Sequence, residues 1–447
     1  MIIAPRIIAV DNEADDLLAL ERAFDGLGGL CECIDFDRAN QRTAPFVTGV
    51  RILFMDINLM PGAGGNAGAR NFAPISAIIS KIIGAENGPY ALITWTKDTA
   101  AHDALVAYLE TNLAEPLRPC ANYCLPKDGH LEDPVALIAK LTTLQSEIPG
   151  LAMLLDWEKA VMKAADRSVH QIAQLSNAYG LKQGLAVAQS VHAISHAAAG
   201  RTEADANPFR AFTQGMSALL ADQLDKAGAD KSTADAWKAS LAAQPIAEPN
   251  DTQRAALNTF FHLEPPDANS SPTFGTIYKI SFNAIKPFLK SRFATHDEAM
   301  IGNEFLPMKE SRNKGNDPQF AQSCEWRLIQ LGAACDHANG KVQVLDGMLA
   351  VEVPESCFEA TNLGSRKNGK TKFGDTPGGL EWLFQTPPFL RDGVRYVLVA
   401  NMRFRISLPK DKMKKLKRAG ALRDALATEI AIHAANFSTR PGTIEFR

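Results

Sequence analysis

Cysteine is scarce in this sequence, and long apolar runs are missing. There are seven cysteines among 447 residues, an odd number without a repeating spacing. This usage argues against a disulfide framework and favours a reducing compartment. The apolar residues 1–10 lack the basic start and the small-residue cleavage site of a secretory signal, and no run of roughly 18 apolar residues occurs elsewhere. We therefore predict a cytoplasmic protein without a membrane partner.

A large excess of charge of one sign is missing as well. The formal net charge is −3, with 22% charged and 46% hydrophobic residues. Such a balance gives the whole chain no attraction to nucleic acid or to a membrane surface, so we expect no nucleic-acid partner. The length exceeds what one hydrophobic core usually supports, which predicts two or three domains.

The first 150 residues alternate between strand and helix patterns. Short β-branched or apolar runs are separated by segments whose apolar residues recur at helical spacing. This alternation predicts an α/β domain with a doubly wound parallel sheet and right-handed crossovers. The expected strands are 6–10, 31–36, 51–56, 90–96 and 123–126, and the expected helices are 13–24, 74–83, 99–113 and 133–146.

The rest of the chain changes character twice. After Pro149-Gly150 it becomes alanine-rich and helical, and after Pro245 it is rich in Pro, Asn and Ser with one expected helix near 283–292. These shifts predict a first domain over 1–148, a helical connector or dimerisation segment over 151–245, and an α+β domain over 246–447. The connector is expected to hold a long helix with an apolar stripe over 154–175 and further helices at 181–199, 209–226 and 233–243. Strands are expected at 326–331, 341–344, 348–353 and 396–406, with a final helix at 421–437.

Two acids and a lysine stand where apolar runs of the first domain stop. Asp11 follows the first run, Asp56 ends the third, and Lys127 follows the fifth. Because the carboxyl ends of parallel strands open on one crevice, these side chains are expected to converge there. Carboxylates and an amine gathered in this way suit a magnesium ion and a phosphoryl group.

Each of these residues has an expected role. The carboxylate of Asp56 can attack phosphorus only if the repulsion between two anions is removed. Asp11 and Asp56, with the backbone carbonyl of Asn58, are the expected Mg²⁺ ligands, and Lys127 would pair with the phosphoryl oxygens. A hydroxyl at the end of the fourth strand would donate a hydrogen bond to phosphate. Thr96 is the main candidate for it, and Thr94 remains open.

Four short motifs carry a resemblance to a known family. They are VDNE at 10–13, FMD at 54–56, ITWT at 93–96 and PK at 126–127. Taken in this order, they make the first third of the chain resemble the receiver domains of two-component response regulators. The resemblance implies a flavodoxin-like fold and Mg²⁺-dependent phosphorylation of Asp56 by a histidine kinase. It implies no enzymatic activity apart from phosphoryl acceptance and slow autodephosphorylation.

The chain departs from the family pattern at three positions. Asn12 stands where the family usually has a second acid, so either magnesium binds more weakly or Glu13 substitutes as a metal ligand. Pro126 precedes Lys127, whereas the family usually has a proline after this lysine. Cys124 occupies a position that is often aromatic, so the usual signalling rotation of an aromatic ring would be blunted.

The layout of the chain also resembles receiver proteins of phage-defence operons. A diverged receiver is followed by a helix with the sequence LDWE at 155–158 and by no DNA-binding module. In the Detocs type of system, such a protein serves as a phosphate sink in antiviral defence. This resemblance implies an effector protein of the same operon as a partner, and a homodimer is a further expectation.

Other features suggest alternative functions. The basic stretch 403–418 would suit DNA, which would make the protein a transcription regulator. Residues 364–371 match a P-loop pattern, and Cys335-Asp336-His337 resembles a catalytic cluster, so a receiver-gated enzyme remains open. His192 and His196 have the i, i+4 spacing of metal ligands, but without an evident third ligand we expect solvated or packed histidines.

Overall fold

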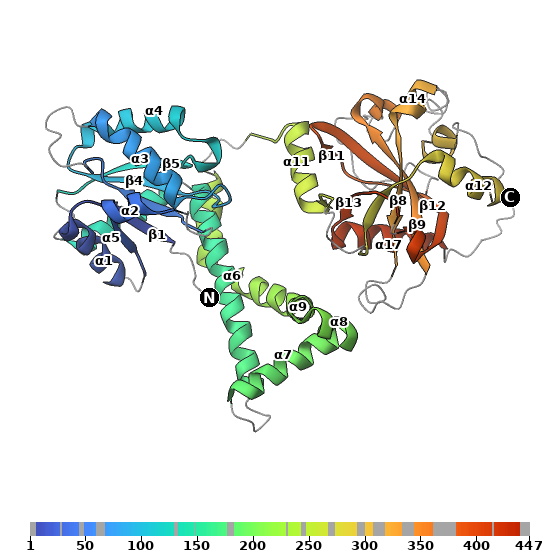
Figure 1. The fold of residues 1–447 in the computed structure, drawn as a ribbon, viewed down its shortest axis with the longest axis horizontal. Coiled ribbons are helices and arrows are strands. Elements are labelled where there is room, and N and C mark those ends of the chain that lie inside the picture. The colour runs from blue at the N-terminus through green and yellow to red at the C-terminus, as the bar shows by residue number, and fades with distance from the viewer. Residues whose placement is uncertain are drawn as a thin grey trace. The chain divides into compact units, whose positions relative to one another are not determined.

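The computed structural model shows two compact units (Figure 1). One unit comprises Met1–Ser168 with Asp222–Pro245, and the other comprises Val169–Ala221 with Ile246–Arg447. The three-part division expected from composition stays a prediction. The structure describes residues 6–26, 29–43, 49–59, 68–128, 133–147, 149–176, 183–228, 231–242, 247–266, 273–292, 300–306, 318–332, 344–360, 381–413 and 415–438.

The first unit contains a five-stranded parallel sheet. Its strand order is β2-β1-β3-β4-β5, and every neighbouring pair runs parallel. The predicted α/β class with an N-terminal parallel sheet is therefore confirmed. The strands are β1 (Ile7–Asp11), β2 (Glu32–Asp35), β3 (Ile52–Met55), β4 (Ala91–Thr96) and β5 (Ala121–Pro126).

Helices cover both faces of this sheet. On one face, α1 (Ala14–Gly26) and α5 (Pro134–Glu147) pack over a core that includes Phe54 and Trp95. The other face carries α2 (Phe36–Gln41), α3 (Gly68–Ile82) and α4 (His102–Asn112). Strand β4 is buried at all six positions because both faces are covered, which explains its nearly unbroken apolar sequence.

The expected second strand was too long, and helix α2 was not predicted. The Asp35 carboxylate accepts a hydrogen bond from the Arg38 backbone N–H at 2.9 Å. A side-chain cap of this kind satisfies a backbone donor in the first helical turn. The strand therefore ends at Asp35, and Phe36 begins a helix instead of continuing the sheet.

A cluster of charged residues lies at the amino-terminal end of the strands of the parallel sheet. Glu158, on the long helix α6 (Pro149–Ser176), contacts Arg51 at 2.6 Å and Arg6 at 3.0 Å. Both arginines directly precede strands, so α6 is held against the sheet edge that lies opposite to the crevice. Attraction to Arg51 and Arg6 outweighs the effect of burial and lowers the pKa of the Glu158 carboxyl.

Further helices follow α6 in the described part of the chain. They are α7 (Gln183–Ala199), α8 (Arg201–Ala206), α9 (Pro208–Gly228) and α10 (Lys231–Ala242). Helix α8 was not predicted from the sequence. It begins directly after Gly200, which has a φ of 78° and so lies in the left-handed region that favours glycine. The chain thereby turns between α7 and α8 without a longer loop.

The second unit contains a curled antiparallel sheet, which confirms the predicted mixture of strands and helices after residue 246. Its strand order is β10-β12-β9-β8-β7-β13-β6, with β11 paired to β12. Its strands are β6 (Leu263–Glu264), β7 (Thr276–Lys279), β8 (Glu325–Gln330), β9 (Val344–Pro354), β10 (Leu383–Gln385), β11 (Phe389–Arg391), β12 (Val394–Pro409) and β13 (Arg418–Leu422).

Several expectations for this unit were wrong. The separate strands expected at 341–344 and 348–353 are replaced by the single strand β9 over Val344–Pro354. The final helix α17 spans Asp424–Ser438 and does not begin at residue 421, because Arg418–Leu422 pairs with β7 and β6 as strand β13. Helix α11 (Asp251–His262) was missed in a segment expected to hold one helix, although Asn250 and Gln253 form a capping box at its start. The unit also contains α12 (Phe282–Arg292), α14 (Pro318–Ser323) and α16 (Lys410–Met413).

Some sequence motifs lie outside the described residues. These are the P-loop-like segment 364–371 and the cluster Cys335-Asp336-His337. The six cysteines within the described residues are free thiols. No described helix is both long enough and apolar enough to traverse a lipid bilayer.

Candidate functional site

Three carboxylates surround one amine at the carboxyl-terminal edge of the parallel sheet. The Lys127 Nζ atom lies 2.7 Å from Asp11 Oδ2, 2.7 Å from Asp16 Oδ2 and 3.0 Å from Asp56 Oδ2. The convergence of Asp11, Asp56 and Lys127 is the arrangement expected from their places at strand ends. We call Asp11, Asp16, Asp56 and Lys127 together the acidic cluster.

The strands place the members of the acidic cluster through backbone hydrogen bonds. Asp11 is the last residue of β1, and the Asp56 N–H donates to the Val10 carbonyl at 3.0 Å. The Lys127 N–H donates to the Thr96 carbonyl at 3.0 Å, directly beyond the end of β5. Pro126 is the last residue of β5, so a proline before the lysine is compatible with this position.

Burial makes the electrostatics of the acidic cluster strong. All four side chains are nearly inaccessible, with residue exposures of 1% for Asp11, 6% for Asp16, 3% for Asp56 and 2% for Lys127. If every group is ionised, three negative charges face one positive charge. A buried excess of negative charge is unfavourable unless a cation or a proton compensates it.

The pKa shifts in the acidic cluster reflect this excess. Burial, followed by repulsion from the Asp56 carboxylate, raises the pKa of Asp11 to about 6 against the attraction of Lys127. Burial disfavours the charged amine of Lys127 and by itself would lower its pKa. Attraction to the Asp11 and Asp56 carboxylates is stronger, so the pKa of the amine is raised. The amine therefore stays charged, while Asp11 holds a proton in mildly acidic solution.

Besides Asp11 Oδ2 and Asp16 Oδ2, which form ion pairs with Lys127, two side-chain oxygen atoms at this edge have no hydrogen-bond partner among the described residues. They are Asp56 Oδ1 and Asn12 Oδ1, and both are buried. Buried acceptors usually have a partner, so such atoms indicate a site for a donor or a cation. Oxygen ligands of this type are the ones that Mg²⁺ prefers.

Not all expected ligands join the acidic cluster. The Glu13 side chain is exposed and accepts a hydrogen bond from Asn12 Nδ2 at 3.3 Å, while the Glu13 N–H donates to Asp11 Oδ1 at 3.0 Å. The Glu13 backbone thus orients Asp11, and its carboxylate lies away from Lys127. Asn58 is half-buried two residues after Asp56, and the role of its carbonyl stays a prediction.

The two candidate threonines differ in their surroundings. Thr94 Oγ1 donates to the Tyr123 carbonyl at 3.0 Å and lies 2.8 Å from His102 Nδ1. Thr96 Oγ1 accepts from the Asp98 N–H at 3.1 Å, and an accepting hydroxyl keeps its own proton for donation. The Thr96 backbone carbonyl accepts from the Lys127 N–H, and the role of either threonine toward a phosphoryl group stays a prediction.

Asp16 is the member of the acidic cluster that was not predicted. It lies in the first turn of α1, four residues before Leu20 and seven before Ala23, and all three are buried. This spacing puts one carboxylate on the apolar stripe of an amphipathic helix. An acid within such a stripe was the sequence signal that could have identified it.

Comparison with known proteins does not assign this chain to a family. No model of a known protein family matches the sequence, and no curated protein matches it. The chemistry of the acidic cluster must therefore be inferred from its geometry.

Proposed function

We propose that the first unit is a phosphoryl-accepting receiver module and that the protein acts in two-component signalling. The observation that carries this proposal is the contact of Asp11, Asp16 and Asp56 with Lys127 Nζ at the carboxyl edge of the sheet. The strand order β2-β1-β3-β4-β5 supports it, because this is the flavodoxin-like order of doubly wound sheets that bind ligands at this edge.

Asp56 is the proposed phosphoryl acceptor. Its Oδ1 atom lacks a partner among the described residues, while Oδ2 contacts Lys127 at 3.0 Å. Oδ1 would attack phosphorus, the bond between phosphorus and the donor would break, and the donor would leave with its electron pair. The product is an acyl phosphate, and the charged Lys127 amine would pair with its oxygens.

The residues of the acidic cluster also fit a magnesium ion. Asp11, Asp16 and Asp56 would hold it, since they are buried carboxylates that exceed the positive charge of Lys127. When bound, Mg²⁺ would neutralise charge on the phosphoryl oxygens. Asp16 would then take the place of the acid that is missing at Asn12.

A histidine kinase is the proposed donor, and the output is either signalling or storage of phosphate. The four motifs at 10–13, 54–56, 93–96 and 126–127 occur in the same order as in receiver domains, which supports a histidine kinase as the donor. The arrangement of the chain supports a phosphate sink in antiviral defence. An effector protein of the same operon is the proposed partner. Phosphorylation of Asp56 would change the charge of the acidic cluster and so bias the contacts of the module.

The structure favours neither alternative function. The basic stretch 403–418 forms the end of β12, the four-residue helix α16 and the start of β13, so its described residues supply no helix that could fill a major groove. A pocket of about 570 Å³ adjoins α17. Its described lining includes Asp346 and Arg405 but no histidine or cysteine.

Acetyl phosphate provides a direct test of the proposed function. Incubation of the full chain with acetyl phosphate and Mg²⁺ should add one phosphoryl group, because the acidic cluster needs only a donor and a cation. Intact-mass spectrometry measures the gain, and omission of Mg²⁺ with added chelator should prevent it. A folded protein that gains no mass from acetyl phosphate and is not stabilised by beryllofluoride with Mg²⁺ would refute the proposal.

We also expect Asp16 to matter more for metal binding than Glu13. Asp16→Asn should weaken Mg²⁺ binding by about tenfold or more, since it removes a buried carboxylate from the acidic cluster. Titration calorimetry above the pKa of Asp11 measures the affinity, with Asp15→Asn as the matched control because Asp15 is exposed on the same helical turn. A larger loss in Glu13→Gln than in Asp16→Asn would restore Glu13 as the ligand.

A further inference from the structure

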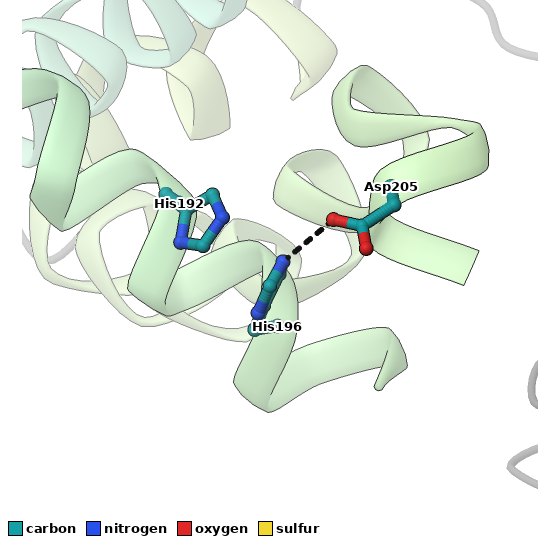
Figure 2. Close-up of side chains that lie close together, drawn as sticks. All are labelled: His192, His196 and Asp205. Carbon is teal, nitrogen blue, oxygen red and sulfur yellow. Dashed lines mark hydrogen bonds and ion pairs between the residues drawn. The ribbon is translucent and has the colours of Figure 1, made fainter. Parts of the chain in front are cut away.

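A second group of potential metal ligands lies on helices α7 and α8, separate from the acidic cluster. Figure 2 shows His192 and His196 one turn apart on α7, with the carboxylate of Asp205 facing them from α8. The imidazole ring centroids are 3.8 Å apart, and His196 Nε2 lies 3.0 Å from Asp205 Oδ1. Each of the three residues offers one possible ligand atom, and these three atoms all lie within 4.8 Å of one another.

The turn at Gly200 brings Asp205 to the histidine pair. The Gly200 N–H donates to the His196 carbonyl at 2.9 Å, and the Ala204 N–H donates to the Gly200 carbonyl at 3.0 Å. Ala199, Ala204 and Ala211 form a small buried cluster that holds α7, α8 and α9 together. The backbone positions of the three ligands are therefore set by packing, while their side chains can adjust.

The structure shows a candidate third ligand that the sequence did not reveal. Solvated or packed histidines were expected because no third ligand was evident near His192 and His196. Asp205 lies nine residues after His196, but the α7–α8 turn brings its carboxylate within hydrogen-bonding distance. The third ligand is thus supplied by tertiary structure and not by a local motif.

We propose that His192, His196 and Asp205 form a binding site for zinc or a similar divalent transition metal. Two imidazoles at i, i+4 with one carboxylate are a ligand set of borderline softness, which suits Zn²⁺ better than Mg²⁺. Tetrahedral ligation with metal–ligand bonds of about 2.1 Å needs ligand atoms about 3.4 Å apart. His192 and Asp205 are exposed, so small side-chain rotations can close the remaining distance.

A metal at this site would connect α7 to α8 across Gly200. The ion would replace the His196–Asp205 hydrogen bond by bonds to both side chains, and water would complete its coordination. Two helices joined only by a one-residue turn would then be cross-linked near their ends. The site would stiffen this corner.

Zinc titration of the full chain tests the site. With Mg²⁺ in excess to occupy the acidic cluster, the protein should bind one Zn²⁺ against a chelating indicator. His192→Gln and His196→Gln should weaken this binding by about 100-fold, and Asp205→Asn by about tenfold, because each removes one ligand. Zinc should also slow amide hydrogen exchange in α8, a readout that does not involve phosphoryl transfer.

His170→Gln is the matched control. His170 is an exposed histidine on helix α6, outside the three-residue group, and its replacement should leave zinc affinity unchanged. Circular dichroism verifies that each variant is folded. The proposal would be overturned if His192→Gln and His170→Gln bound zinc as tightly as the unmodified protein, or if His170→Gln lost as much affinity as His192→Gln.

Discussion

Replacement of Lys127 by methionine should lower the free energy of unfolding around the parallel sheet by about 3–5 kcal/mol. Methionine is one atom shorter, keeps an unbranched apolar side chain and removes the charge. Asp11, Asp16 and Asp56 would then lie together without the amine that contacts all three within 3.0 Å. Buried charges that lose their partner are among the most destabilising changes in proteins. Native-state hydrogen exchange of the β4 amides reports this effect locally.

Magnesium should reverse part of the loss in Lys127→Met. A divalent cation supplies the positive charge that the three carboxylates lack, so Mg²⁺ should stabilise this variant more than it stabilises the unmodified protein. Lys97→Met is the matched control, because Lys97 is exposed just beyond the end of β4. If Lys127→Met and Lys97→Met unfold with the same free energy, the amine does not balance the carboxylates as we infer.

Replacement of Asp56 by asparagine should abolish phosphorylation and leave the fold intact. The amide retains an oxygen for the contact with Lys127 but cannot attack phosphorus as a carboxylate does. It also removes one negative charge from a buried cluster in which negative charges are in excess. Asp56→Asn should therefore gain no mass from acetyl phosphate, while its free energy of unfolding without metal should equal or exceed that of the unmodified protein.

The two readouts of Asp56→Asn separate chemistry from folding. Asp15→Asn is the control, since Asp15 is exposed and should change neither labelling nor stability. A full mass gain in Asp56→Asn would show that another residue accepts the phosphoryl group. A large loss of stability would show that the Asp56 carboxylate is needed to hold the sheet together, contrary to the excess of negative charge that we infer.

The positions of Asp11, Asp56 and Lys127 could be predicted because each follows a short apolar run. In a parallel sheet with helical crossovers, the ends of such runs meet at one edge whatever the details of the loops. The central strands β1, β3 and β4 were recognisable because they are almost entirely buried and their sequences are apolar runs.

Other elements were missed because their signals are not local hydrophobic periodicity. Helix α2 depends on a cap from Asp35, and α8 depends on a left-handed glycine at residue 200. Strand β13 exists because it pairs with β7 and β6, which are more than 130 residues away in the sequence. Sequence periodicity does not report such long-range pairing.

Local sequence was therefore sufficient for the α/β character of the N-terminal region and for three members of the acidic cluster, because strand ends and crossovers constrain where those residues lie. Tertiary packing decided which further acid joins them. Helix α1 turns Asp16 inward with Leu20 and leaves Glu13 exposed, because Glu13 precedes the helix. Packing likewise brought Asp205 to His196, through a helix turn whose geometry no residue spacing encodes.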